Sequence, residues 1–222
     1  MVKYLIIVFV VLGLALPAQA QQIICEDTYG DSTASTNRYK FLFTTPSSNN
    51  DVVVAGFKQI IPSSSHINTH FLWKINSSCD TVWSYSTPHS NTALSDILTS
   101  TNNSFIILSN YALSGNNSEI EIEKIAPNGN FLWRNSPSNS TTLSASTFVE
   151  LSDSNLFITG VDLATSSAST FKIFCLKTDN SGNQVWHKNL FLPYTRPGFQ
   201  NSIPHGIIHS RDGNLYISGT NE

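Results

Sequence analysis

The stretch that decides the fold is Lys177-Thr178-Asp179-Asn180-Ser181-Gly182-Asn183-Gln184-Val185-Trp186. Two earlier stretches align with it without a gap, with the lysine and the tryptophan in the same register. They are Lys74-Ile75-Asn76-Ser77-Ser78-Cys79-Asp80-Thr81-Val82-Trp83 and Lys124-Ile125-Ala126-Pro127-Asn128-Gly129-Asn130-Phe131-Leu132-Trp133. The three tryptophans recur roughly every 50 residues, a period typical of repeat architectures.

Each copy has the pattern of two strands joined by a tight turn. An apolar strand ends near the lysine, a turn rich in Asn, Asp, Ser and Gly follows, and a second strand carries the tryptophan. Gly129 and Gly182 hold the same turn position, where glycine readily adopts a positive φ. Because Cys79 holds this position in the first copy, its turn is expected to differ.

A second repeated feature is a short apolar segment after a polar turn, found at residues 52–56, 105–109, 156–160 and 215–219. Three of these segments end in a glycine, namely Gly56, Gly160 and Gly219. Their apolar residues are consecutive rather than alternating. This pattern predicts strands that are covered on both faces, as happens when sheets stack face to face.

Together the two features predict an all-β chain, a partial β-propeller of four-stranded antiparallel blades with about three and a half repeats of about 50 residues. The expected units are residues 39–88, 89–142 and 143–195, followed by an incomplete unit at 202–222. No long segment shows the 3.6-residue apolar stripe of a helix. A β-sandwich is the alternative fold, which the gapless register of three copies disfavours.

The number of units raises the question of ring closure. Closed propellers contain roughly 4–8 blades, more than the expected units supply. We therefore expect either a fragment of a longer protein or a chain that assembles with another. The hairpin at 202–222 would offer an unpaired edge through which the chain could associate with itself.

The N-terminus has the layout of a secretory signal peptide. Lys3 precedes an apolar run that Pro17 ends, and Ala18 and Ala20 supply the small residues of a cleavage site before Gln21. A membrane anchor is the alternative, but a spanning helix needs roughly 20 apolar residues and this run is shorter. We expect a signal peptide at 1–20, an N-terminal segment at 21–38, and a secreted protein in the periplasm, at the cell surface or outside the cell.

Composition excludes several classes of partner. Charged residues make up 12% of the chain, against roughly 25% in typical domains, and the net charge is −3. No basic cluster of the kind that binds nucleic acid occurs. No second segment is apolar enough to span a bilayer, so no membrane span is expected once the signal peptide is removed.

The chain has three cysteines, Cys25, Cys79 and Cys175. Export would permit a disulfide. Cys25 and Cys79 are the candidate pair, because Cys175 lies inside an apolar strand and is expected to be buried and unpaired. Three unpaired thiols remain the alternative. No C-x-x-C motif supports a zinc or thiol-redox site.

Candidate site residues have simpler structural explanations. Trp83, Trp133 and Trp186 are expected to be largely buried between units rather than to hold a ligand. His205 and His209 lack a third metal ligand nearby, and the segment 179–183 lacks the later acid of a calcium loop. We therefore assign no catalytic, cofactor-binding or metal-binding residue and expect no cofactor.

Three acids alternate along one expected strand, Glu119, Glu121 and Glu123, and so share one face. Glycoside hydrolysis needs two acids across a cleft. A strand face in contact with solvent is the expectation.

The pattern Lys177, Asp179, Gly182 and Trp186 resembles the tryptophan-docking repeat of quinoprotein-like β-propellers, and still more the divergent repeats of secreted bacterial proteins. The resemblance covers residues 39–222. It implies a propeller scaffold, and no motif for a quinone cofactor matches.

Two functions are consistent with these features. The first is an exported non-enzymatic scaffold or binding protein whose partner is a protein or a glycan. The alternative is the N-terminal part of a secreted propeller enzyme, a glycan hydrolase or lyase, whose catalytic residues lie outside this chain. The lack of a catalytic motif favours the first.

Overall fold

A computed structural model describes residues 37–60, 67–87, 92–113, 118–137, 142–162, 172–190 and 202–221. The first sheet contains β1 (Asn37–Pro46), β2 (Val52–Ile60), β3 (Ile67–Ile75) and β4 (Thr81–Ser86), with the short 3-10 turn η1 (Ser48–Asn50) after β1. The second contains β5 (Thr92–Thr99), β6 (Phe105–Ala112), β7 (Ser118–Ile125) and β8 (Phe131–Asn135). The third contains β9 (Leu143–Glu150), β10 (Leu156–Asp162), β11 (Lys172–Thr178) and β12 (Gln184–Leu190), and a hairpin of β13 (Ser202–His209) and β14 (Leu215–Asn221) follows.

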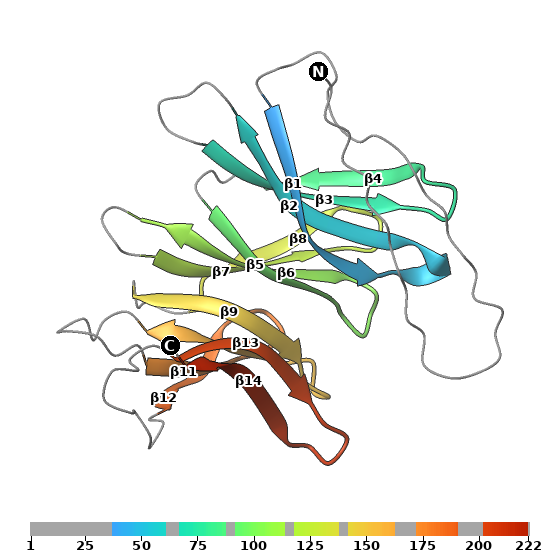
Figure 1. Ribbon diagram of the computed structural model, residues 1–222. Helices are drawn as coiled ribbons and strands as arrows, with labels where there is room; N and C mark the ends of the chain where they lie inside the picture. Colours follow the sequence, from blue (N-terminus) through green and yellow to red (C-terminus); the bar gives the residue numbers. More distant parts are fainter. Residues whose placement is uncertain are drawn as a thin grey trace.

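Every sheet is an antiparallel meander in which neighbouring strands follow one another in the chain. The sheets stack in sequence order and do not close into a ring (Figure 1). The first strands of successive units, β1, β5, β9 and β13, pack against one another in turn. The prediction of an all-β partial β-propeller with four-stranded antiparallel blades is confirmed.

The turns explain why the chain reverses at the same points in each unit. In the turn before β8, the N–H of Ala126 bonds the carbonyl of Asn130 and the N–H of Gly129 bonds the carbonyl of Ala126. The first unit has the same bonds, with Cys79 in the place of Gly129. Cys79 adopts a φ of 71°, close to the 88° of Gly129. The expectation that its turn differs is wrong, because the cysteine takes the left-handed conformation.

Apolar residues fill the space between adjacent sheets. One cluster joins the first and second sheets through Val53, Ala55, Leu72, Phe105 and Ile107. A second cluster joins the second and third sheets through residues such as Ile106, Leu108, Ile122, Ile158 and Phe174. Consecutive residues of β6 therefore point into different cores, and five in a row are buried. The consecutive apolar pattern arises from this two-sided burial.

Three second strands carry a glycine where the first strand bulges. Gly56 lies opposite the irregularity at Phe41, and Gly160 and Gly219 lie at the corresponding places. A Cβ atom at any of them would collide with a backbone carbonyl oxygen of the neighbouring strand. Glycine lets the bulged strand approach closely.

The repeated lysines lie on the third strands. Lys74 forms an ion pair of 3.0 Å with Asp51, and Lys177 forms one of 3.2 Å with Asp153. Both acids belong to the turn between the first and second strands. Lys124 is buried at the corresponding place of the second unit. In the first and third units the lysine thus connects the third strand to the turn between the first and second strands.

The tryptophans join one unit to the next. The Trp83 ring lies against Gly129 of the second unit, and its Nε1–H donates to the carbonyl of Pro127 at 3.0 Å. The Trp133 ring lies against Gly182 of the third unit. A Cβ atom at Gly129 or Gly182 would come within 2.8 or 2.9 Å of these rings. Glycine at these two positions therefore serves two needs. It adopts the positive φ of the turn, and it leaves room for the indole of the preceding unit.

Trp83, Trp133 and Trp186 occupy corresponding positions on β4, β8 and β12, but each is only half-buried. The expectation of large burial is wrong in degree, because these strands are outermost in their sheets. The prediction that Cys175 is buried and unpaired is confirmed. Among the described residues, no helix is long and apolar enough to cross a membrane.

Candidate functional site

Two acids on β7 are buried in the described part of the molecule. Glu121 is 4% and Glu123 2% exposed, and they share the face of β7 on which Glu123 bonds Tyr85 and Thr87 of the first unit. The expectation of a solvated strand face is wrong for these two. Alternation along a strand shows that they share a face, but the first sheet packs over that face and removes it from water.

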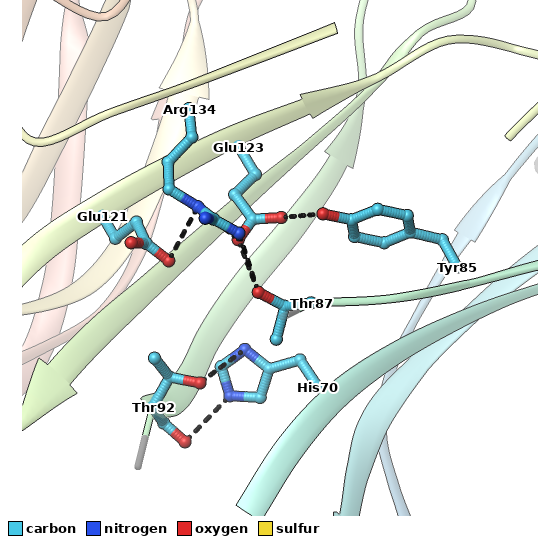
Figure 2. A network of polar contacts seen from close by, with 7 residues as sticks. All are labelled: His70, Tyr85, Thr87, Thr92, Glu121, Glu123 and Arg134. Carbon is cyan, nitrogen blue, oxygen red and sulfur yellow. Dashed lines mark hydrogen bonds and ion pairs between the residues drawn. The ribbon is translucent and has the colours of Figure 1, made fainter. Parts of the chain in front are cut away.

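Arg134 on the neighbouring strand β8 lies between the two acids (Figure 2). Its Nε donates to Oε1 of Glu123 at 2.9 Å and lies 3.3 Å from Oε1 of Glu121, while its Nη2 lies 2.5 Å from Oε1 of Glu123. Glu123 and Arg134 are direct partners in the β7–β8 register. The hairpin itself therefore brings the guanidinium to the carboxylate.

The first sheet supplies two hydroxyl groups to the same carboxylate. Tyr85 on β4 donates to Oε2 of Glu123 at 2.7 Å, and Thr87, just after β4, donates to Oε1 at 2.8 Å. Thr87 also accepts a bond of 2.9 Å from Nη2 of Arg134. These bonds cross the interface between two units, so the cluster connects the first and second sheets.

Hydrogen bonds fix the charge state of Glu123. Burial alone would raise its pKa, but the bonds from Tyr85, Arg134 and Thr87 outweigh burial, and the pKa lies below its ordinary value. Burial and the bond to Glu123 raise the pKa of Tyr85. Glu123 is thus a carboxylate and Tyr85 a neutral phenol across the physiological range.

His70 and Thr92 form a second polar pair beside this cluster (Figure 2). The Nε2 atom of His70 lies 2.9 Å from the carbonyl oxygen of Thr92, and Nδ1 lies 3.3 Å from its hydroxyl. A carbonyl can only accept, so Nε2 carries the proton and Nδ1 accepts from the hydroxyl. Burial lowers the pKa of His70, in agreement with this neutral form.

An open depression of about 510 Å³ lies at the same end of the second sheet. Thr92 belongs to both the polar pair and its wall, and the other lining residues are Ala93, Asn110, Ala112, Leu113, Ser118 and Ser144. Asn110 is braced by two bonds to the backbone of Ala145, of 2.9 and 2.8 Å. Ser118 donates to the carbonyl of Leu143 at 2.9 Å.

The chemistry of these two places differs. Both acids of the cluster are engaged by one guanidinium, and the low pKa of Glu123 leaves it unsuited to deliver a proton at neutral pH. In the described part of the chain, no three His, Cys, Asp or Glu side chains are placed to hold a metal ion. The cluster bonds the first unit to the second, whereas the depression is lined by hydroxyl and amide groups.

The other candidate residues serve the local structure. Exposed His205 bonds the hydroxyl of Thr220 at 2.9 Å, and His209 is half-buried on the same strand. Oδ1 of Asp179 accepts from the backbone N–H groups of Ser181 and Asn183 at 2.9 and 2.8 Å. This segment is a hairpin turn. Cys79 is disulfide-bonded, but Cys25 and the signal peptide expected at 1–20 lie outside the described residues.

A comparison of the units with one another would have revealed the cluster. Glu121 and Glu123 take the places of Phe71 and Trp73 in the first unit and of Phe174 and Leu176 in the third, counted from the turns. Acids at positions that are apolar in both other units signal buried charge. The partner Arg134 follows the docking tryptophan directly.

Neither a protein-family model nor a curated protein matches this chain. The assignment of a function therefore rests on its own residues.

Proposed function

We propose that this protein is an exported binding scaffold of bacterial origin, with stacked β-propeller blades that present the depression of the second unit to a glycan or to an extended protein segment. The N-terminal signal-peptide pattern supports export. The disulfide at Cys79 supports it independently, because disulfides persist mainly in oxidising compartments.

The lining of the depression supports a neutral polar ligand. Its wall is neutral and polar, with hydroxyl groups on Thr92, Ser118 and Ser144 and the braced amide of Asn110, and Ala93 and Ala112 leave room beside them. Such groups bond sugar hydroxyls or peptide backbone. Few charged residues occur in the chain as a whole, which favours the same ligand classes.

The single observation that carries the proposal is the bracing of this surface. Asn110 joins the second unit to Ala145 of the third, and Ser118 bonds Leu143 across the same junction. A preorganised surface loses little conformational freedom on binding. A depression spanning two locked units is suited to holding a ligand.

The test uses the mature chain on an array of neutral oligosaccharides and on a library of extended peptides, followed by calorimetry with the best probe. Ala112→Trp would place an indole in the depression, because Ala112 is exposed there. Thr101→Trp adds the same indole to an exposed turn at the other end of β6 and serves as the control.

We expect the probe to bind the wild type and the Thr101→Trp variant, and to lose affinity at least tenfold, about 1.4 kcal/mol, for Ala112→Trp. Equal binding by both variants would place the ligand elsewhere. Turnover of an oligosaccharide by the wild type would favour the enzyme alternative instead.

A further inference from the structure

The turn before β8 is the only place in the chain where an asparagine is followed by a glycine, Asn128-Gly129. In this dipeptide an asparagine loses ammonia readily, because glycine has no side chain to hinder its backbone nitrogen from attacking the asparagine amide. The corresponding turns of the first and third units contain Ser78-Cys79 and Ser181-Gly182 instead. Asn128 is exposed, so water reaches its amide.

The reaction needs no partner except water. The backbone nitrogen of Gly129 gives its proton to the solvent and forms a bond to Cγ of Asn128. The bond from Cγ to the side-chain nitrogen breaks, and ammonia leaves a succinimide ring behind. Water then opens the ring: cleavage between the nitrogen and Cγ gives aspartate, and cleavage between the nitrogen and the other carbonyl carbon gives isoaspartate. In total one water molecule is consumed and one ammonia molecule is released.

Hydrogen bonds engage both reacting groups in the closed turn. The N–H of Gly129 donates to the carbonyl of Ala126 at 2.9 Å, and this is the proton that the nitrogen must lose. Oδ1 of Asn128 accepts from the N–H of Asn130 at 3.1 Å. Cyclisation therefore requires the turn to open first.

Trp83 of the first unit holds the turn closed. Its ring lies so near Gly129 that a Cβ atom there would be 2.8 Å from the indole, and its Nε1–H donates to the carbonyl of Pro127 at 3.0 Å. The peptide unit between Asn128 and Gly129 must rotate during cyclisation, and the indole occupies the space on one side of it. The turn can rearrange when Trp83 leaves, which is a local opening of the first junction.

The two products have different effects on the turn. Aspartate keeps the backbone unchanged, and Asp153 and Asp212 show that it suits a turn of this kind. In their turns Oδ1 accepts from the N–H two residues later at 3.1 Å, the same distance as at Asn128. Isoaspartate adds one methylene carbon to the main chain, which displaces Gly129 from its place under the indole.

We propose that Asn128 is a modification site controlled by the docking of Trp83. Asn128 converts to isoaspartate while the indole is away from the turn, and the isoaspartate then keeps Trp83 from docking again. Deamidation thereby makes a reversible local opening between the first and second units permanent. The inference does not depend on a ligand in the depression, so it stands apart from the proposed binding function.

The first test follows deamidation of Asn128 by peptide mapping of the full mature chain in a mildly alkaline buffer. Trp83→Ala removes the indole from the turn. Trp186→Ala removes the corresponding half-buried indole of the third unit and is the matched control. Where opening is fast relative to cyclisation, the rate follows the population of the open turn.

We expect Trp83→Ala to deamidate at least tenfold faster than the wild type, a difference of about 1.4 kcal/mol, and Trp186→Ala to keep the wild-type rate. Equal rates in the wild type and Trp83→Ala, or the same acceleration in both variants, would overturn the proposal.

Cys175 reports whether Trp83→Ala is still folded, because this thiol is free and buried in the third unit. It should resist alkylation in the variant as in the wild type. If it reacts, Trp83→Phe decides the question: this variant keeps an aromatic ring beside Gly129 and loses the donor to Pro127. Trp83→Phe should deamidate faster than the wild type, and an unchanged rate would then count against the proposal.

The second test asks whether isoaspartate prevents docking. Wild-type protein aged in urea contains both products, which are separated by chromatography after refolding and compared by oxidative footprinting. We expect labelling of Trp83 to rise several-fold in the isoaspartate form and to stay low in the aspartate form and in Asn128→Asp. Labelling of Trp133, which docks on the next unit, should be the same in all forms. A protected Trp83 in the isoaspartate form would contradict the proposal.

Discussion

Arg134 neutralises a carboxylate that has almost no contact with water. Glu123 is 2% exposed and receives bonds from Arg134, Tyr85 and Thr87. Removing one partner of a buried ion pair costs about 3–5 kcal/mol, because the remaining charge stays uncompensated. The cluster is therefore a point at which a single substitution weakens the contact between two units.

We predict that Arg134→Met lowers the free energy of unfolding by about 3–5 kcal/mol, measured by urea denaturation. Lys177→Met is the control, since its ion pair with Asp153 is exposed, and it should change stability little. The double variant Arg134→Met, Glu123→Met should recover part of the loss. A small effect of Arg134→Met would show that the cluster does not hold the sheets together.

His70 makes stability depend on pH. Its pKa is lowered by burial, against about 6.5 for an unfolded histidine. Below about pH 6.5 the unfolded chain takes up a proton that the folded chain does not, so the free energy of unfolding falls as pH falls. Glu123, the charged group that acts on His70, has a lowered pKa and loses its contribution only in more acidic solution.

We predict that the free energy of unfolding decreases between pH 7 and 5 and that His70→Gln flattens this dependence. His205→Gln, at an exposed position of β13, should leave it unchanged. Urea titrations at several pH values measure the effect. The same slope in His70→Gln as in the wild type would contradict the assignment of a neutral buried histidine.

The junction between two sheets depends on the turn before each outer strand. Gly182 and Gly213 have nearly the same φ, 81° and 83°, but only Gly182 lies under a tryptophan ring. A Cβ atom at Gly213 would meet nothing within 4 Å. Substituting each glycine in turn thus separates the free-energy cost of backbone strain from the cost of displacing the tryptophan.

We predict that Gly213→Ala costs about 1–2 kcal/mol, from the left-handed backbone alone. Gly182→Ala should cost a further 1–3 kcal/mol, roughly, because the methyl group displaces Trp133. Chemical denaturation of both variants gives the difference. Equal costs would mean that the indole does not rest on the glycine.

Much of each element was predictable from the sequence, and the failures have physical causes. The Lys–Trp register and the apolar second strands predicted the four-stranded units, because turn chemistry and two-sided burial are local signals. The burial of Glu121 and the half-burial of Trp133 were not predictable, since both depend on how far a neighbouring sheet extends over a strand. The positive φ of Cys79 was not predictable from the residue type. The hydrogen-bond pattern of the turn is kept even though a non-glycine residue adopts this φ at a cost in free energy.

At the scale of the whole molecule, the hairpin of β13 and β14 leaves apolar side chains in water. Ile208 and Tyr216 are cross-strand partners, 63% and 53% exposed. We propose that this surface and the β14 edge mediate self-association of the chain. Light scattering after size exclusion should show concentration-dependent oligomers, which Ile208→Lys with Tyr216→Lys reduces. A monomer at all concentrations would contradict the proposal.

The central claim is that the units are joined by the tryptophan of one unit on the turn glycine of the next, and a double-mutant cycle tests it most directly. Trp133→Ala should cost about 3–5 kcal/mol. Without the indole, Gly182→Ala should lose its extra cost, which gives a coupling energy of about 1–3 kcal/mol with Trp133→Ala. The control cycle of Trp133→Ala with Gly213→Ala should be additive within about 0.5 kcal/mol. If the costs of Trp133→Ala and Gly182→Ala were also additive, the result would contradict the stacking of units described by this structure.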